Sequence, residues 1–568
     1  MTGIGASSGI AYGKVFKLLE EDYEISKISK DEAQDEILKL KNAVLKAKEQ
    51  IKELIEIALD QLGEKESEIF NAHYMILEDP EFMDSIINGI NKERYTAEYA
   101  VKEASEEIIN VFSDMDNAYM KERASDIKDV SDRIIKNILG IKIKDLSLID
   151  EQVIIVAEDL TPSDTVMIDR SLVLGFITKI GGVTSHSAIM ARTMGLPAVV
   201  GVGEDIDRIK DSEFIIMDGD TGDIIINPNT EEMDIAKNIL QMEEKNRELL
   251  KSFKGRPSET KDSHRIELAC NIGSPNDIDA VIENDGEGIG LFRSEFLYMN
   301  HEDLPSEDEQ FEAYKRVLTA MEGRPVIIRT LDVGGDKELP YLNLEREMNP
   351  FLGCRAVRLC LREVEIFRTQ LRALLRASLY GNLKIMFPMI SSYKEIIEVK
   401  EQLNIAKQEL LDRGEGFSED IKIGIMIEIP SAALISDILA KEVDFFSIGT
   451  NDLVQYTTAV DRINQNVSYL YSHFHPAVLR LMKTVAKNAN NEGTWVGICG
   501  EAAGDIRLLP FLVGIGLNEL SVSSSKVLKI RSELKKLSYI DCKNVVESVL
   551  TMNSAEKIQE YLEKIMEY

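Results

Sequence analysis

The hydrophobic positions of this 568-residue chain follow two different periods, and the period changes along the sequence. Between Asp31 and about Gly140, apolar residues recur every three or four positions, as they do along one face of amphipathic helices. This stretch predicts about four antiparallel helices. Their expected breaks lie near Gly63, Asp79-Pro80, Thr96 and Ser125.

Short strand-like runs flank this helical stretch on both sides. Residues 1–18 read as glycine-punctuated strands, and β-rich runs return at 152–228. We therefore expect one α/β domain made of residues 1–20 and 145–228, with an all-α subdomain inserted at 21–144. The highly charged stretch 229–260 predicts a linker helix.

From residue 264 onward, apolar strand-like runs alternate with helical stretches. Eight βα units in roughly 300 residues fit a TIM barrel, here over 261–568, and a doubly wound open sheet is the alternative. The expected strands are 266–272, 287–293, 325–332, 383–389, 421–429, 444–451, 494–500 and 518–523. The whole chain is thus predicted to be a multidomain α/β protein.

Composition narrows the class of protein further. Apolar residues make up 44% and charged residues 29% of the chain, which is ordinary for a globular protein. A formal net charge of −33 disfavours a nucleic-acid partner; it would favour a small basic protein partner, or serve solubility alone. Five cysteines without a CxxC spacing, no signal peptide and no long apolar run predict a cytoplasmic protein that does not insert into a membrane.

The barrel hypothesis places functional side chains where strands end, at the C-terminal face. Polar and charged residues do follow the predicted strands at these points. They are Arg293, Arg329, Arg355, Glu428, Asn451, Asp452, Arg462 and Cys499. Four arginines and two carboxylates at one face are harder to explain as structural than a single arginine at a strand end.

These residue types fit a small substrate that carries both a phosphate and a carboxylate. Guanidinium groups bind such oxygens bidentately. Glu428 and Asp452 could hold Mg²⁺, with water and substrate oxygens completing its coordination. Asn451 could donate to a phosphoryl oxygen. Cys499 could donate a proton to the substrate, or it could be a small buried apolar residue.

His186 is the candidate phosphoryl acceptor. It follows the strand-like run 172–179 and a Gly181-Gly182 turn, and it precedes a helical run. A phosphoryl group there would lie near helix-terminal N–H groups, which favour anions, and a neutral imidazole is nucleophilic. A structural histidine after a glycine turn is the alternative.

Two segments resemble the signatures of phosphoenolpyruvate (PEP)-utilising enzymes. They are Gly-Gly-Val-Thr-Ser-His-Ser-Ala-Ile-Met-Ala-Arg at 181–192 and Asp-Phe-Phe-Ser-Ile-Gly-Thr-Asn-Asp-Leu-Val-Gln-Tyr at 444–456. Their order and the chain length are most similar to the Enzyme I family of the bacterial sugar phosphotransferase system. Further matching stretches are 3–11, 72–81, 159–165, 287–297, 328–337, 349–355, 425–430 and 497–501.

The resemblance implies a Mg²⁺-dependent transfer of the phosphoryl group from PEP to His186 and then to the carrier protein HPr, with release of pyruvate. It implies that Thr165 orients the histidine and that Cys499 protonates the enolate. Substrate binding would fall to Arg293, Arg329, Arg355, Asn451, Asp452 and Arg462, and metal binding to Glu428 and Asp452. The helical subdomain would dock HPr, and the barrel would form a homodimer.

Departures from the family pattern and two rival readings qualify this hypothesis. Val183 stands where an arginine is usual, and Thr458 stands where an apolar residue is usual. His473 and His475 could suggest a metal site, but loop positions near a dimer surface are the favoured reading. A pyruvate phosphate dikinase or a phosphoenolpyruvate synthase would need an additional nucleotide-binding domain. A catalytically silent scaffold would be free to lose part of the residue set.

His186 and the arginines fall in different predicted domains, so catalysis requires movement about the 229–260 region.

Overall fold

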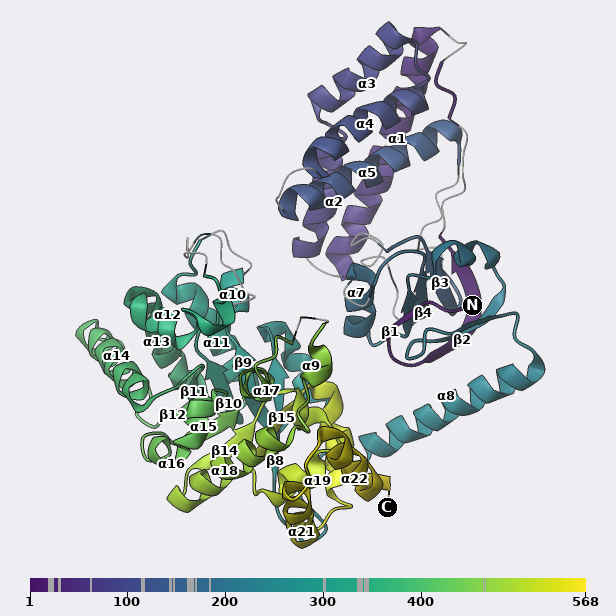
Figure 1. Ribbon diagram of the computed structural model, residues 1–568. Helices are drawn as coiled ribbons and strands as arrows, with labels where there is room; N and C mark the ends of the chain where they lie inside the picture. The colour runs from purple at the N-terminus through teal and green to yellow at the C-terminus, as the bar shows by residue number, and fades with distance from the viewer. Residues whose placement is uncertain are drawn as a thin grey trace. The chain divides into compact units, whose positions relative to one another are not determined.

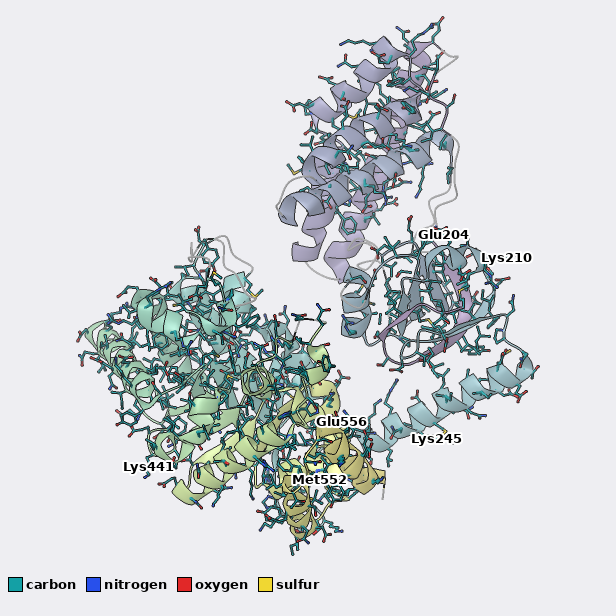
Figure 2. All side chains as sticks on the ribbon, viewed as in Figure 1. Glu204, Lys210, Lys245, Lys441, Met552 and Glu556 are labelled. Carbon is teal, nitrogen blue, oxygen red and sulfur yellow. The ribbon has the colours of Figure 1, made fainter. Side chains whose placement is uncertain are left out.

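The structure is a computed structural model of the full chain. It describes residues 1–18, 25–28, 32–61, 64–113, 118–141, 146, 149–160, 168, 171–182, 185–299, 303–334, 341, 347–462, 464 and 466–567. The chain divides into two compact units, Met1–Lys245 and Asn246–Tyr568. The division falls within helix α8 (Thr230–Lys251), after Lys245, which is labelled in Figure 2.

A mixed sheet of seven strands organises the first unit (Figure 1). Its order is β1-β5-β4-β3-β2-β6-β7, with β2 to β5 parallel and the other neighbours antiparallel. The strands are β1 (Ile4–Ser7), β2 (Ile10–Lys17), β3 (Val153–Ala157), β4 (Val173–Thr178), β5 (Ala198–Val200), β6 (Phe214–Asp218) and β7 (Ile224–Ile226). The β-rich runs expected at 1–18 and 152–228 are therefore confirmed as strands of one sheet.

The residues described between the paired strands β2 and β3 form five helices in chain order, one more than the four or so that the sequence predicted. They are α1 (Ala33–Gln61), α2 (Glu64–Ile76), α3 (Pro80–Glu93), α4 (Ala97–Ser113) and α5 (Ala118–Leu139). The breaks near Pro80 and Thr96 are confirmed, and Gly63 lies outside the described residues, between the end of α1 and the start of α2. The break at Ser125 is wrong, because α5 runs through that position. Ile127, Val130 and Ile134 are buried at helical spacing, so packing of this face outweighs the helix-start signal of a serine.

The second unit is a closed barrel of eight parallel strands, and the open-sheet alternative is excluded (Figure 1). Its strands are β8 (Glu267–Ile272), β9 (Gly288–Arg293), β10 (Pro325–Arg329), β11 (Asn382–Phe387), β12 (Lys422–Ile427), β13 (Phe445–Ile448), β14 (Trp495–Ile498) and β15 (Glu519–Val522). Seven of these strands lie within the predicted runs, and β11 begins one residue before the run predicted at 383–389.

Helices surround this barrel and bury its outer face against one large hydrophobic core. They are α9 (Ile278–Glu283), α10 (Phe296–Met299), α11 (Glu307–Ala320), α12 (Val357–Arg362), α13 (Val364–Ala377), α14 (Tyr393–Asp412), α15 (Pro430–Leu434), α16 (Ser436–Leu439), α17 (Thr450–Thr458), α18 (Pro476–Glu492), α19 (Leu509–Gly514), α20 (Val527–Leu534), α21 (Tyr539–Leu550) and α22 (Ala555–Glu567). The interior of the barrel holds a smaller apolar layer that includes Ile327, Met386, Met426 and Phe445. The barrel is thus filled with side chains, which leaves its two ends for polar groups.

All five cysteines are free thiols, as the sequence led us to expect. Within the described residues, no helix combines the length and the apolar character that a membrane span requires.

Candidate functional site

The C-terminal ends of the barrel strands bring the predicted residues to one face. Arg293 and Arg329 are the last residues of β9 and β10, and Glu428 and Cys499 directly follow β12 and β14. Asn451 and Asp452 lie in the first turn of α17, which begins two residues after β13. In an α/β barrel, this is the face where catalytic groups are found.

Two buried arginines form the centre of the site. Arg329 pairs with Glu295 and with Asp332, whose Oδ2 lies 2.9 Å from Nη1 of the arginine. Arg355 donates from Nη2 to Oδ1 of Asp332 at 3.0 Å, and its Nη1 lies 3.6 Å from Oδ1 of Asp452. Burial lowers the pKa of both guanidinium groups, but the surrounding carboxylates more than offset it and raise the pKa of each. Both arginines therefore keep their charge although they are shielded from water.

Glu428 is a buried carboxyl beside these ion pairs. Burial raises its pKa to about 8, and the negative charges of Asp452 and Asp332 add to that effect. Its Oε1 accepts the backbone N–H of Met389 at 2.6 Å, and Met389 has a positive φ of 57°. A bulky residue in the left-handed region is strained, so the chain holds this donor on Glu428 at a cost in backbone energy.

The carboxylates at this end fit a divalent cation. Glu428 and Asp452 interact strongly enough to raise the pKa of Glu428, and this excess of negative charge is what a cation would neutralise. Oxygen ligands suit a hard cation such as Mg²⁺, which commonly takes one or two carboxylates and completes its shell with water and substrate oxygens. Within the described residues, no group of three or more His, Cys, Asp or Glu side chains surrounds a possible metal position.

Cys499 is a buried thiol at the same end of the barrel. Its Sγ contacts the backbone oxygen of Ile448 at 3.8 Å, and its own backbone oxygen accepts a hydrogen bond from Asn271 at 3.2 Å. Burial raises the pKa of this thiol to about 11. Cys499 is therefore protonated at neutral pH, and it can serve as a proton donor rather than as a thiolate nucleophile.

Asn451 is held in a two-way contact with the residue that follows Gly500. Its side-chain Nδ2 donates to Oε1 of Glu501 at 3.2 Å, and its Oδ1 accepts the backbone N–H of Glu501 at 3.1 Å. The hydroxyl of Tyr471 donates to the backbone oxygen of Asn451 at 3.2 Å. The amide is thus fixed in the first turn of α17, where a bound anion would compete with Glu501 for its N–H groups.

The other two predicted arginines lie nearer the solvent. Arg293 is exposed, and in the barrel register it is the partner of Arg329 on the neighbouring strand. The backbone N–H of Arg462 donates to Oε1 of Gln455 at 3.2 Å. Burial and the charge of Glu501 raise the pKa of Tyr471 to about 12, and the nearby charge of Arg462 acts in the opposite direction. The structure therefore brings Arg329, Arg355, Glu428 and Asp452 together, with Arg293 and Arg462 at their periphery.

His186 lies in the first unit, as the first residue of helix α7 (His186–Met194). Ser185 caps this helix through a hydrogen bond from the N–H of Ala188 to its Oγ at 3.3 Å. The preceding turn needs a glycine: Gly181 has a φ of +112°, and a Cβ there would lie 3.0 Å from Oγ of Ser185. Thr165 and Val183 lie outside the described residues.

Three site residues escaped the sequence reasoning: Asp332, Glu295 and Tyr456. Asp332 stands three residues after Arg329 and fell inside the predicted strand 325–332, so it was read as part of a strand. The hydroxyl of Tyr456 accepts from Nη1 of Arg355 at 3.4 Å. The two loop histidines are not part of a metal cluster in the described residues: His473 contacts Asp505 at 3.0 Å, and His475 caps α18.

A barrel with buried arginines and carboxylates at its C-terminal face defines an enzyme for a small, strongly anionic substrate. Models of the PEP-utilising enzymes match three segments of the chain: the N-terminal part at 2–123, the mobile domain at 149–222 and the PEP-binding domain at 247–539.

Relatives match along the full length of the chain. The phosphoenolpyruvate-protein phosphotransferases of Bacillus subtilis (strain 168) and Priestia megaterium are 49% and 51% identical to it. Each alignment covers 99% of this chain, with 99% of the first relative and 98% of the second. The chain therefore belongs to the PEP-utilising enzymes, in the family of phosphoenolpyruvate-protein phosphotransferases. The expected fold class, enzyme class and overall reaction are confirmed.

Proposed function

We propose that the chain transfers the phosphoryl group of PEP to His186 and then to the histidine of the carrier protein HPr, as the first step of sugar uptake. The observation that carries this proposal is the pair of buried, carboxylate-bound arginines at the C-terminal face of the barrel, in a chain that belongs to this family. Pyruvate would be the second product.

The substrate-binding groups in this proposal are Arg293, Arg329, Arg355, Asn451, Asp452 and Arg462. PEP carries a phosphate and a carboxylate, and two guanidinium groups can bind both ends. Within the described residues, Nε of Arg329 and Nε of Arg355 are buried without a hydrogen-bond acceptor. Substrate oxygens that approach the two arginines would supply the missing acceptors, since a buried donor is costly to leave unpaired.

PEP-utilising enzymes use a metal ion, and we propose that Glu428 and Asp452 hold Mg²⁺ here. Bound at this position, the ion would neutralise negative charge on the phosphoryl oxygens. The buried carboxyl of Glu428 and the helix-borne Asp452 would remain its protein ligands. The all-oxygen, two-carboxylate donor set suits a hard divalent ion such as Mg²⁺.

In the first half-reaction, the bond between phosphorus and the enol oxygen breaks as a nitrogen of His186 bonds to phosphorus. The electron pair of the broken bond stays with the enolate of pyruvate. Cys499, which is protonated at neutral pH, would then give its proton to the terminal carbon of that enolate and recover it from water. The second half-reaction returns the phosphoryl group from His186 to the carrier.

His186 suits this role because it begins α7, where backbone N–H groups favour an anionic adduct. We further propose that Thr165 orients the imidazole. Because the histidine and the barrel site belong to different compact units, the two must come together during the first half-reaction and separate before the second. The segment around 229–260 would permit that movement.

The remaining assignments complete the proposal. The helical subdomain at 21–144 would dock HPr, the divided α/β domain at 1–20 and 145–228 would carry the histidine, and the barrel at 261–568 would form a homodimer. A net charge of −33 would favour a small basic carrier. We place the enzyme in the cytoplasm.

The test is to incubate the purified chain with PEP labelled in its phosphoryl group, with Mg²⁺ and without nucleotide. Acid-labile, base-stable label on the parent protein, together with stoichiometric pyruvate, is the expected result. His186→Ala should take up no label. The matched control His473→Ala should label like the parent, because it removes a loop histidine. No label on the parent, or label that appears only with ATP, would refute the proposal and favour the silent-scaffold or dikinase reading.

A further inference from the structure

One buried carboxylate joins the two central arginines of the site. Asp332, which is 2% exposed, lies three residues beyond β10. Its Oδ2 lies 2.9 Å from Nη1 of Arg329, and its Oδ1 accepts from Nη2 of Arg355 at 3.0 Å. Each oxygen thus contacts a different guanidinium group, so the carboxylate sets the distance between the two groups.

The backbone also fixes this arrangement. The N–H of Ala356 donates to the backbone oxygen of Val333 at 3.0 Å, which joins the loop after β10 to the segment that carries Arg355. Ala356 has a φ of 52°, and Gly334 has a φ of +103°. A Cβ on Gly334 would lie 2.6 Å from Cβ of Arg355. The loop therefore needs a glycine to approach Arg355 this closely, and two residues adopt unusual backbone conformations around the contact.

We propose that Asp332 is a positioning residue that holds Arg329 and Arg355 at the separation needed to bind the phosphate and the carboxylate of PEP. The inference rests on the proposed function and deepens it. Two guanidinium groups that contact the same carboxylate lie close enough to repel each other, and the charge of Asp332 offsets this repulsion. Nε of each arginine is still without a protein acceptor among the described residues.

A different role for Asp332 predicts the opposite effect of its removal. If Asp332 were a mere competitor for the arginines, a neutral substitute would expose more positive charge and tighten the binding of an anionic substrate. If Asp332 positions the arginines, the neutral substitute lets them move apart and weakens binding. The sign of the change in KM for PEP separates the two roles.

The barrel offers a matched control in a second arginine–aspartate pair, in which the arginine is buried and the aspartate is partly exposed. Arg531, which is 0% exposed, pairs with Asp285 and donates from Nη2 to the backbone oxygen of Asp285 at 2.8 Å. Its Nε donates to Oγ of Ser258 at 2.9 Å. None of these residues is part of the proposed substrate or metal site, so Asp285→Asn removes the charged partner of a buried arginine without changing the substrate-binding arginines.

The experiment compares the full-length parent with Asp332→Asn, Asp332→Glu and Asp285→Asn. It measures KM for PEP and kcat for carrier phosphorylation, and it follows thermal unfolding. We expect Asp332→Asn to lower kcat/KM for PEP by about 100-fold, mainly through KM, since displacement of a binding group by about 1 Å has effects of this size. Asp285→Asn should lower the thermal midpoint and leave KM near the parental value.

Asp332→Glu keeps the charge but adds one methylene, so it should fold and show a KM between those of the parent and Asp332→Asn. This variant decides the question if Asp332→Asn fails to fold. An unchanged or lower KM in Asp332→Asn, a parental KM in Asp332→Glu, or an equal rise in KM in Asp285→Asn would each overturn the inference. In all these cases the parent still labels from PEP, whereas failure of the proposed function would remove that labelling from the parent itself.

Discussion

At the C-terminal end of the barrel, buried carboxylates lie among arginines, whereas at the N-terminal end two carboxyls face each other. Glu267 and Glu519 are the first residues of β8 and β15, and they are register partners on neighbouring strands. Within the described residues, Oε1 of each is buried without a hydrogen-bond partner. Lys384 lies near both, with its Nζ 4.4 Å from the ring centre of Trp495, but it forms no ion pair with either in the described residues.

The two ends therefore deal with buried negative charge in different ways. At the C-terminal end, Arg329 and Arg355 pair with neighbouring carboxylates, although burial raises the pKa of Glu428 to about 8. At the N-terminal end, burial and the mutual repulsion of the two carboxyls raise the pKa of Glu519 well above its ordinary value, and the pKa of Glu267 is raised as well, so both carboxyls favour their neutral form. The arginines at the C-terminal end can bind an anionic substrate, whereas the two N-terminal carboxyls bring no positive charge to such a site. The comparison explains why the chemistry belongs to one end.

The largest effect should come from replacing a positively charged side chain at the C-terminal end. Arg329→Met would leave Glu295 and Asp332 buried without their shared partner. We expect the free energy of unfolding to fall by about 3–5 kcal/mol, as it does when one member of a buried ion pair is removed. The kcat/KM for PEP should fall by about a thousand-fold. Denaturant unfolding and steady-state kinetics measure the two effects.

Arg329→Lys is the matched control for this variant. Lysine keeps the charge but not the planar fork, so most of the stability should return while KM for PEP stays high. If Arg329→Met unfolded with the parental free energy, the carboxylates at this end would not depend on the arginine. The contrast between the two ends of the barrel would then fail.

The sequence predicted the position of the C-terminal site better than its internal contacts. The rule that barrel strands end at the functional face located Arg329, Glu428 and Cys499 without coordinates. It could not pair Arg329 with Glu295 or Arg355 with Asp332, because those contacts depend on how loops fold back over the barrel. Nor could it place Arg293 at the exposed edge of the site, because a residue's distance from the solvent is set by its neighbours in space.

The N-terminal carboxyl pair had no usable sequence signal. Glu267 and Glu519 each stand at the start of an apolar run, where a charged residue normally marks a strand end that reaches solvent. Only the closure of the barrel brings β15 next to β8 and turns both side chains toward the same place. Gly290 on β9 makes the necessary room, since a Cβ there would lie 2.4 Å from Oε1 of Glu519.

A smaller and opposite effect is expected at the N-terminal end. The pKa of Glu519 is raised above its ordinary 4.5, so the folded chain holds a proton that the unfolded chain releases. The contribution of Glu519 to stability is therefore fully present below pH 4.5 and is lost as the pH rises toward the folded pKa. Glu519→Gln is neutral at every pH. Relative to the parent, its free energy of unfolding should gain about 1–3 kcal/mol as the pH rises above the ordinary pKa of the carboxyl.

Urea unfolding at several pH values measures this gain, with the exposed Glu419→Gln as a control that should follow the parent throughout. The charged and titratable groups around the pair are Lys384, Glu287, Arg265, Cys270 and Cys499, and all of them are retained in both variants. A parental pH dependence in Glu519→Gln would show that the two carboxyls are already compensated, and it would remove the difference between the two ends.

The smallest effect should come from Lys384→Met, which sharpens the comparison by asking how far the N-terminal pair is screened. Lys384 lowers the pKa of both Glu267 and Glu519, although burial dominates and raises them overall. Without this cation both pKa values rise further, so the loss of stability with increasing pH should extend to a higher pH. The lost contact with Trp495 should lower the free energy of unfolding by about 0.5–1 kcal/mol.

The control is Lys422→Met, because Lys422 is the register partner of Lys384 on β12 but is exposed. If both lysine variants gave the same pH profile, the charge of Lys384 would have no effect on the pKa of Glu267 or Glu519.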